Sequence, residues 1–240
     1  FSIAVRNFEE FIYPKDKIEW IIVDDSSEEH TIVDLVPKDK RIHFFELRDP
    51  NSKEVTKLTI AQKRNIGASK AKGEIIVHMD DDDYYPPESI LARVKVLMKY
   101  KKDGIKCVGC TEIGTYNLME NKSSMSSDGP ISFSEASMAY YRDFWVERAF
   151  NNHQLRAEHK DFMENRLDAC MDIPYAFVLI ALTHHNNYTS FRKISRNTLK
   201  FRDNNRDANF YDIWDEETQF FMSDLRRYIS QCNKLAESSQ

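Results

Sequence analysis

The sequence has no long hydrophobic run. Its longest apolar segment, residues 176–182, has the length of a strand, whereas a membrane-spanning helix needs about 18 apolar residues or more. We therefore expect no transmembrane segment. No signal peptide is visible. The chain opens on Phe1 instead of a methionine, which suggests an incomplete N-terminus.

An excess of basic residues is also missing. Lys and Arg number 34 against 39 Asp and Glu, for a net charge of −5, so the composition does not predict a nucleic-acid partner. The four cysteines include one CxxC, at Cys107 and Cys110, but no second pair that would complete a zinc site. Few, unpatterned cysteines are typical of a reducing compartment. We therefore expect a cytoplasmic location, or one on the cytoplasmic face of a membrane.

Helix and strand patterns alternate through the first half of the 240 residues. We expect helices over 1–13, over 56–72 and from residue 86 onward. Apolar, β-branched runs at 18–23, 41–47, 74–79 and 106–108 are typical of buried strands. This alternation predicts an α/β fold with a mostly parallel, Rossmann-like central sheet flanked by helices.

The pattern changes after about residue 115. We expect a mobile loop at 117–130, strands at 131–141 and 173–183, helical stretches near 142–151 and 154–171, and an amphipathic helix around 215–235. The chain then reads as a nucleotide-binding half (1–115), a mixed acceptor-binding and catalytic half of the same domain (116–200), and a helical tail (201–240).

Two expected strands end in acids. Asp24 and Asp25 follow the first strand, and an acidic run follows the third; it consists of Asp80, Asp81, Asp82 and Asp83. The carboxyl ends of strands in an open α/β sheet border the ligand crevice, and spaced carboxylates suit a hard divalent cation. The alternatives are a solvated turn for the acidic run, and a turn or helix cap at Asp24 and Asp25.

Three further pairs of residues have either a functional role or an ordinary structural one. Lys63 and Arg64 form either a solvated helix face or a cationic edge for a diphosphate. Glu158 and Asp161, three residues apart, are either ordinary surface charges or a source of a general base. His184 and His185 end the expected strand at 173–183, as satisfied polar residues or as ligands that complete a metal shell. The phosphate-binding patterns GxxxxGK[ST] and GxGxxG are missing.

Several motifs, taken in order, resemble family-2-like glycosyltransferases of the GT-A fold. The closest matches are IIVDDSS (21–27), AQKRNIGASKAKGEIIVHMDDDD (61–83) and the Pro-Pro-Glu-Ser helix start. The segments EASMAYYRDFW (135–145), AEHKDFMENR (157–166) and LTHHNNYTSFR (182–192) match less closely. The family's opening strand is missing from this sequence, which suggests truncation.

The resemblance implies a role for each candidate. A D-x-D element would bind Mn²⁺ or Mg²⁺, with Asp82 as the direct metal ligand and Asp80 on the metal and sugar–ribose side; Asp81 is the residue between them. Asp25, with Asp24, would read the uracil, and Lys63 and Arg64 would edge the nucleotide pocket. His184 or His185 would complete the metal shell. Glu158 is the first choice for the base and Asp161 the second, although the family's adjacent Glu-Asp is replaced here by Glu158-His159.

The implied activity is metal-dependent transfer of a hexosyl or pentosyl group from a nucleotide sugar, most simply a UDP-sugar, with inversion. The acceptor hydroxyl would belong to a glycan, a protein or a lipid, as in glycan biosynthesis. Two rivals stay open: a sugar-phosphate nucleotidyltransferase, and a non-catalytic domain that binds metal or nucleotide.

Overall fold

The computed structural model describes residues 1–47, 57–127, 132–155, 157–183 and 209–238. The chain divides into two compact units. Unit 1 consists of Phe1–Glu112 and Ser127–Leu179, and unit 2 of Ile113–Ser126 and Ile180–Gln240. None of the helices in the described ranges is both long enough and apolar enough to cross a membrane.

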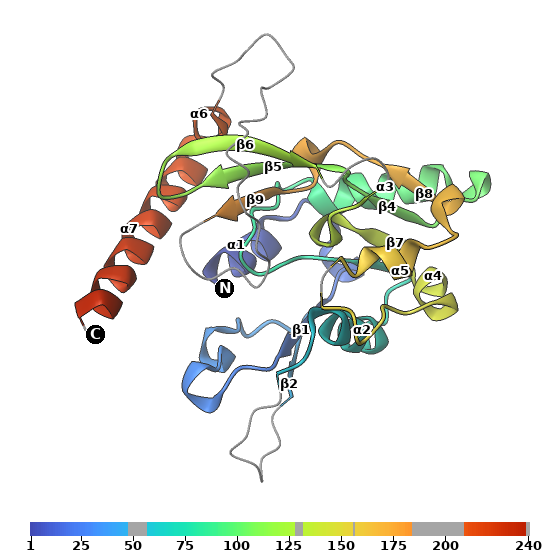
Figure 1. The fold of residues 1–240 in the computed structure, drawn as a ribbon, viewed down its shortest axis with the longest axis horizontal. Coiled ribbons are helices and arrows are strands. Elements are labelled where there is room, and N and C mark those ends of the chain that lie inside the picture. The colour runs from blue at the N-terminus through green and yellow to red at the C-terminus, as the bar shows by residue number, and fades with distance from the viewer. Residues whose placement is uncertain (48–56, 128–131, 156, 184–208, 239–240) are drawn as a thin grey trace. The chain divides into compact units, whose positions relative to one another are not determined.

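Unit 1 alternates helices with strands, as the sequence predicts (Figure 1). In chain order its main elements are α1 (Ser2–Glu10), β1 (Trp20–Asp24), β2 (Ile42–Glu46), α2 (Ile60–Lys70), β3 (Ile75–Val77), α3 (Ser89–Lys99), β4 (Cys107–Gly109), β7 (Ala139–Tyr141), α4 (Arg142–Glu147), α5 (His159–Met163) and β8 (Cys170–Asp172). A short 3-10 helix, Glu135–Ser137, precedes β7. The predicted α/β class is confirmed.

The strands of unit 1 form two sheets. β1 and β2 run parallel, with Trp20 opposite Ile42 and Asp24 opposite Glu46. The second sheet has the order β3-β7-β4-β8, in which β7 is antiparallel to β3 and β4, and β8 is parallel to β4. The stretch 131–141 was expected to be one strand; within its described part, 132–141, only Ala139–Tyr141 forms a strand. An antiparallel strand thus lies inside the sheet that was expected to be parallel.

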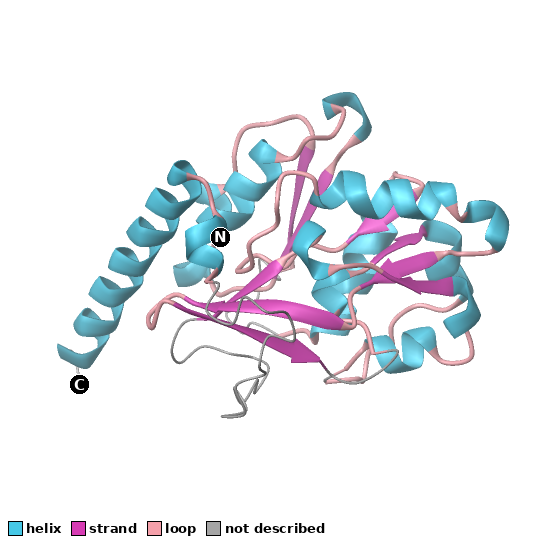
Figure 2. Cartoon of the chain, turned by 90° about the horizontal axis from the view of Figure 1, so that it is seen from above, coloured by secondary structure: helices cyan, strands magenta, loops and turns pink. Residues whose placement is uncertain are grey.

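The prediction of a mobile loop at 117–130 is wrong for residues 122–127, and residues 128–130 lie outside the described residues. β5 (Glu112–Asn117) and β6 (Lys122–Ser127) are neighbours in a sheet of order β6-β5-β9, with β9 (Ile180–Thr183) parallel to β5. The polar serines of β6 hid this strand, because alternation of apolar residues was the signal sought. The helix expected near 215–235 is present as α7 (Glu216–Ser238), after a short α6 (Phe210–Ile213), and Figure 2 shows α7 as one continuous helix.

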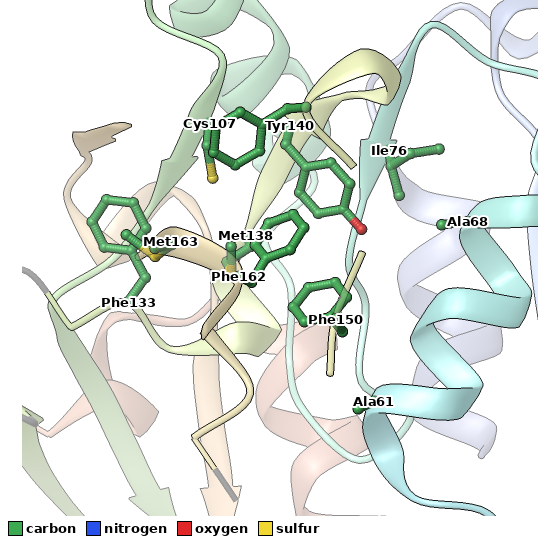
Figure 3. Close-up of a cluster of buried hydrophobic side chains, with 11 residues drawn as sticks. Ala61, Ala68, Ile76, Cys107, Phe133, Met138, Tyr140, Phe150, Phe162 and Met163 are labelled. Atoms are coloured by element: carbon green, nitrogen blue, oxygen red, sulfur yellow. The ribbon is translucent and has the colours of Figure 1, made fainter. Parts of the chain in front are cut away.

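The core of unit 1 is aromatic on one side and small-residue on the other. Phe150 and Phe162 stack with ring centroids 4.1 Å apart. Ala61 and Ala68, the buried residues of α2, present their methyl groups to this cluster (Figure 3). Small side chains let the helix approach the rings closely, and this approach fixes the position of the charged residues on α2.

Candidate active site

The acidic run follows β3 and is held by buried side chains. The Tyr85 hydroxyl accepts a hydrogen bond from the Asp80 amide at 2.9 Å and donates to the Ala136 carbonyl at 3.0 Å. Asn7 of α1 donates to the Asp83 carbonyl at 2.8 Å and accepts from the Tyr85 amide at 3.2 Å. The backbone of this acidic segment is therefore fixed by partners from distant parts of the chain.

A buried arginine anchors the end of β3. Arg93 of α3 is 0% exposed and donates to the His78 carbonyl at 2.9 Å and to the Ser89 hydroxyl at 2.9 Å. Burial lowers the pKa of Arg93 to about 10, which still leaves it charged at neutral pH. Its role is structural, since its partners are carbonyl and hydroxyl oxygens that position the strand end.

The four acids of the run differ in exposure. Asp81 and Asp82 are exposed, the Asp80 side chain is 39% exposed, and Asp83 is buried. Two separated carboxylates, at Asp80 and Asp82, are thus within reach of solvent. In the described part of the chain, no group of three or more His, Cys, Asp or Glu residues gathers as a metal site.

Two of the predicted metal ligands cannot be placed. His184 and His185 lie outside the described residues. The metal prediction for Asp80 and Asp82 therefore stays a prediction. The chemistry of the two carboxylates fits a hard cation, provided that further oxygen ligands come from a bound substrate and water.

Asp24 and Asp25 have different partners. The Asp24 carboxylate accepts from both the amide and the hydroxyl of Ser26, each at 2.9 Å, which is the turn arrangement. Asp25 accepts from the Leu58 amide at 3.0 Å and lies 3.2 Å from Lys63 Nζ. Burial by itself would raise the pKa of Asp25, but the Leu58 amide and Lys63 outweigh it and lower that pKa. Asp25 therefore fixes the segment that leads into α2.

α2 begins with a capping box that the sequence analysis missed. Thr59 Oγ1 accepts from the Gln62 amide at 3.1 Å, and the Gln62 side chain accepts from the Thr59 amide at 2.8 Å. The pattern Thr-x-x-Gln is the signal that would have placed the helix start at residue 60. This cap sets the register that sends Lys63 toward Asp25 and Arg64 toward the acidic run.

Arg64 connects α2 with the acidic run. Its Nη2 lies 3.3 Å from Asp80 Oδ1, and its Nη1 lies 2.6 Å from His78 Nδ1. Burial would lower the pKa of Arg64, but the carboxylates of Asp80, Glu135 and Glu158 raise it. Its Nε is buried and has no hydrogen-bond partner within the described residues. Arg64 is thus a permanent cation with a spare donor, which suits an anionic ligand.

His78, the residue next to Arg64 in this cluster, is held neutral. Burial and the charge of Arg64 lower its pKa well below the usual range. Its Nε2 lies 2.9 Å from the Tyr140 hydroxyl, and its Nδ1 lies 2.7 Å from the Glu135 carbonyl oxygen. His78 therefore joins the strand end that carries the acidic run to the segment that carries Glu135.

A second charged cluster surrounds Glu135 and His159. His159 Nδ1 lies 2.7 Å from Glu135 Oε1, and His159 Nε2 lies 2.8 Å from Ser132 Oγ. Burial would raise the pKa of Glu135, but His159 and Arg64 lower it to about 2. Glu135 is thus ionised over the whole physiological range.

The two predicted bases lie differently. Glu158, 5% exposed, precedes α5, and burial together with nearby Glu135 raises its pKa. Asp161 accepts from Asn151 Nδ2 at 2.8 Å, and its own carbonyl accepts from Arg148. The structure thus brings Glu158 into the Glu135 cluster, whereas Asp161 bonds outside it. The base assignment stays a prediction.

Sequence reasoning missed several residues of this site. Glu135 and Ser132 lay in a stretch expected to be a plain strand, His159 appeared only as a departure from a family pattern, and His78 was quoted without a role. The pairing of Glu135 with His159 spans 24 residues. A periodic pattern within one element carries no signal for such a contact.

A hollow on another side of α2 has a volume of about 440 Å³. Its lining includes Gln62, Asn65, Ser69, Trp145 and Asn152, and none of the predicted site residues lines it. Among the lining residues, Asn65 accepts from Trp145 Nε1 at 2.9 Å and donates to Asn152 Oδ1 at 2.8 Å. The charged clusters described above lie elsewhere.

Comparisons with known proteins agree with the resemblance seen in the sequence. The family model for Glycosyl transferase family 2 matches residues 4–144. The structure of S. aureus TarS 1-349 in complex with UDP-GlcNAc is similar, with a TM-score of 0.59 at 14% sequence identity, over 78% of this chain and 56% of that chain. The complex of TarS 1-349 with UDP gives 0.56 at 15% identity, over 75% and 55%. S. aureus TarS gives 0.57 at 15%, over 75% and 34%.

The present chain therefore spans little more than half the length of the TarS 1-349 structures it matches. At these identities the likeness is one of fold, and it confirms the predicted GT-A-like α/β architecture.

Proposed function

The chain belongs to glycosyltransferase family 2, and from that premise we propose that it transfers a sugar from a nucleotide-diphosphate sugar to an acceptor hydroxyl. The donor we propose is a UDP-sugar. UDP-GlcNAc is the first to test, because similar solved structures hold UDP-GlcNAc and UDP.

The observation that supports this proposal most strongly is the environment of Arg64. A buried guanidinium with a spare Nε donor, paired with the solvent-accessible carboxylate of Asp80, provides both signs of charge that a metal-bound diphosphate needs. Arg64 would donate to diphosphate oxygens. Lys63 and Asp25 would shape the neighbouring edge for the nucleoside, since their ion pair orders the start of α2.

Asp80 and Asp82 are the residues that would hold Mn²⁺ or Mg²⁺. When bound, such an ion neutralises charge on the leaving diphosphate. Arg64 would share that neutralisation, because its guanidinium already lies against Asp80. The acceptor oxygen would attack the anomeric carbon from the face opposite the diphosphate, which gives inversion, after a base has taken its proton. Glu158 and Asp161 are the predicted bases.

The test is a screen of nucleotide sugars for slow, metal-dependent donor hydrolysis, which requires no known acceptor. UDP-GlcNAc is expected to release UDP with Mn²⁺ present and far less in EDTA. Calorimetry with UDP, with and without Mn²⁺, runs beside it. Failure of UDP to bind, with or without metal, would overturn the proposal.

The two rival functions give different results. A sugar-phosphate nucleotidyltransferase would release pyrophosphate from UTP and a sugar phosphate, and would leave UDP-sugars intact. A non-catalytic domain would bind UDP or metal without turning over any donor. The same protein preparation can be given both substrate pairs, so the three outcomes are separable in one experiment.

A further inference from the structure

We propose that His159, in place of the predicted bases Glu158 and Asp161, accepts the proton of the acceptor hydroxyl. Ser132 relays the proton to it, and Glu135 is its positioning residue. This assignment rests on the proposed glycosyl transfer. It concerns a chain of three side chains in unit 1: Ser132 Oγ, 2.8 Å from His159 Nε2, and Glu135 Oε1, 2.7 Å from His159 Nδ1.

The hydrogen bonds fix which nitrogen of His159 carries the proton. Burial would raise the pKa of Glu135, but its hydrogen bond with His159 and the charge of Arg64 lower that pKa to about 2, and an ionised carboxylate only accepts. Glu135 Oε1 also accepts from the His159 amide at 3.3 Å, which holds the residue at the start of α5. Nδ1 is therefore the donor in the neutral ring, and Nε2 has its lone pair directed at the Ser132 hydroxyl.

Exposure explains why a relay is required. His159 is only 4% exposed, whereas Ser132 is partly exposed and bonds to the one ring nitrogen that is free to accept. A substrate hydroxyl can approach Ser132 Oγ without displacing the buried ring. The ring cannot swing outward, because Glu135 holds both its Nδ1 and its backbone amide.

The acceptor O–H bond breaks, its proton passes to Ser132 Oγ, and the Ser132 proton passes to His159 Nε2. The acceptor oxygen forms a bond to the anomeric carbon, while the bond from that carbon to the diphosphate oxygen breaks and its electron pair leaves with the nucleoside diphosphate. His159 becomes an imidazolium, which the Glu135 carboxylate stabilises.

Charged residues link the Ser132, His159 and Glu135 side chains with the residues proposed to bind the donor. Glu135, Glu158 and Arg64 are the charged groups that act on one another here, and Arg64 also pairs with Asp80. Glu158 is buried, and burial together with the charge of neighbouring Glu135 raises its pKa, so it lies next to the carboxylate that orients His159. A proton delivered to His159 is thus received close to the cation proposed to contact the leaving diphosphate.

The experiment compares His159→Gln, Ser132→Ala and Glu135→Gln with Glu158→Gln in the full chain. Each variant is first titrated with UDP by calorimetry in the presence of Mn²⁺, which verifies that it folds and binds. Glycosyl transfer is then measured across pH with a donor and acceptor found by the screen above. His153→Gln, an exposed histidine outside the cluster, is the matched control.

We expect His159→Gln to bind UDP like wild type while kcat falls by a factor on the order of 10²–10⁴, the usual contribution of general-base catalysis. The pH profile of the wild-type rate should differ in shape from that of His159→Gln, because the substitution removes the proton acceptor. Added imidazole should restore part of the activity of His159→Gly.

The proton assignment would be overturned if His159→Gln kept the wild-type kcat, or if Glu158→Gln were the one variant of the four to lose activity. Either result would leave the proposed glycosyl transfer intact. Wild-type protein that turns over no donor would overturn both. If Ser132→Ala keeps full activity while His159→Gln does not, the relay through the serine is wrong.

Discussion

Arg64→Met tests the diphosphate site most directly. The substitution keeps an unbranched stem like that of the arginine and removes its guanidinium. In the wild-type chain that group lies 3.3 Å from Asp80 Oδ1 and 2.6 Å from His78 Nδ1. We expect the variant to bind UDP more weakly and to be somewhat less stable.

The loss of affinity follows from the donors that Arg64 would offer to the diphosphate. A hydrogen bond to a charged group contributes about 1.5–3 kcal/mol. Losing it raises the Kd for UDP on the order of 10- to 100-fold, because each 1.4 kcal/mol or so is a factor of ten. Arg64→Lys keeps a charge but loses the planar fork, so its Kd should fall between the two.

The loss of stability is smaller than for a fully buried pair. Removing one partner of such a pair costs about 3–5 kcal/mol. The Asp80 side chain, however, is 39% exposed and can rehydrate. Glu135 and Glu158 are more buried, and their mutual repulsion is no longer offset by the cation. We therefore expect a loss of about 1–2 kcal/mol in the free energy of unfolding.

Calorimetry with UDP and Mn²⁺ measures the Kd for UDP. Urea denaturation followed by circular dichroism measures the free energy of unfolding. Arg227→Met is the control, because the Arg227 side chain is 70% exposed and lies in unit 2. A Kd within twofold of wild type, with both variants folded, would refute the assignment of Arg64 to the diphosphate.

Three further predictions concern metal, packing and pH. Asp82→Asn should make the Kd for UDP the same with and without Mn²⁺. Asp34→Asn, the control on another exposed segment, should keep the dependence of that Kd on Mn²⁺. If the two variants show the same dependence on Mn²⁺, Asp82 is not a metal ligand. Gly109→Ala should lower the free energy of unfolding by about 1–3 kcal/mol, because the added Cβ would lie 2.6 Å from the ring of Phe133. Gly73→Ala is the control: its Cβ would lie 3.4 Å from the nearest atom, so the midpoint of urea denaturation should change little. Glu135 has a folded pKa of about 2 against 4.5, so its contribution, roughly 3 kcal/mol at most, is present above about pH 4.5 and is lost as the pH falls toward 2. Glu135→Gln should flatten that part of the stability curve, and an unchanged slope would count against an ionised, paired Glu135.

The sequence predicted the elements whose side chains repeat locally. The apolar run before Asp24 became β1, and the helix that carries Lys63 and Arg64 became α2, although it starts at Ile60 instead of residue 56. In each case the pattern lies within one element, and the hydrophobic period identifies it without reference to the rest of the chain.

What the sequence did not predict depends on contacts between distant segments. β6 is polar, and its strand form comes from pairing in the sheet of unit 2 instead of from apolar alternation. β7 is only three residues long and lies between β3 and β4. Its antiparallel direction follows from pairing with these two neighbouring strands, which a three-residue pattern does not reveal. Ser132, Glu135 and His159 carry no shared motif, and their proximity follows from folding the segment before β7 against α5.

The acidic run shows how the two kinds of information combine. Four adjacent carboxylates indicated a charged site, but the partition among them came from the fold. Asp83 is buried and its backbone is held by Asn7, Asp80 meets Arg64, and Asp81 and Asp82 stay exposed. Since Arg64 also acts on Glu135 and Glu158, the charge that offsets the acidic run also favours the ionised forms of these two carboxyl groups. Donor binding and proton acceptance are therefore expected to be energetically coupled through this one guanidinium, so that Arg64→Met should alter the pH dependence of transfer as well as the affinity for UDP.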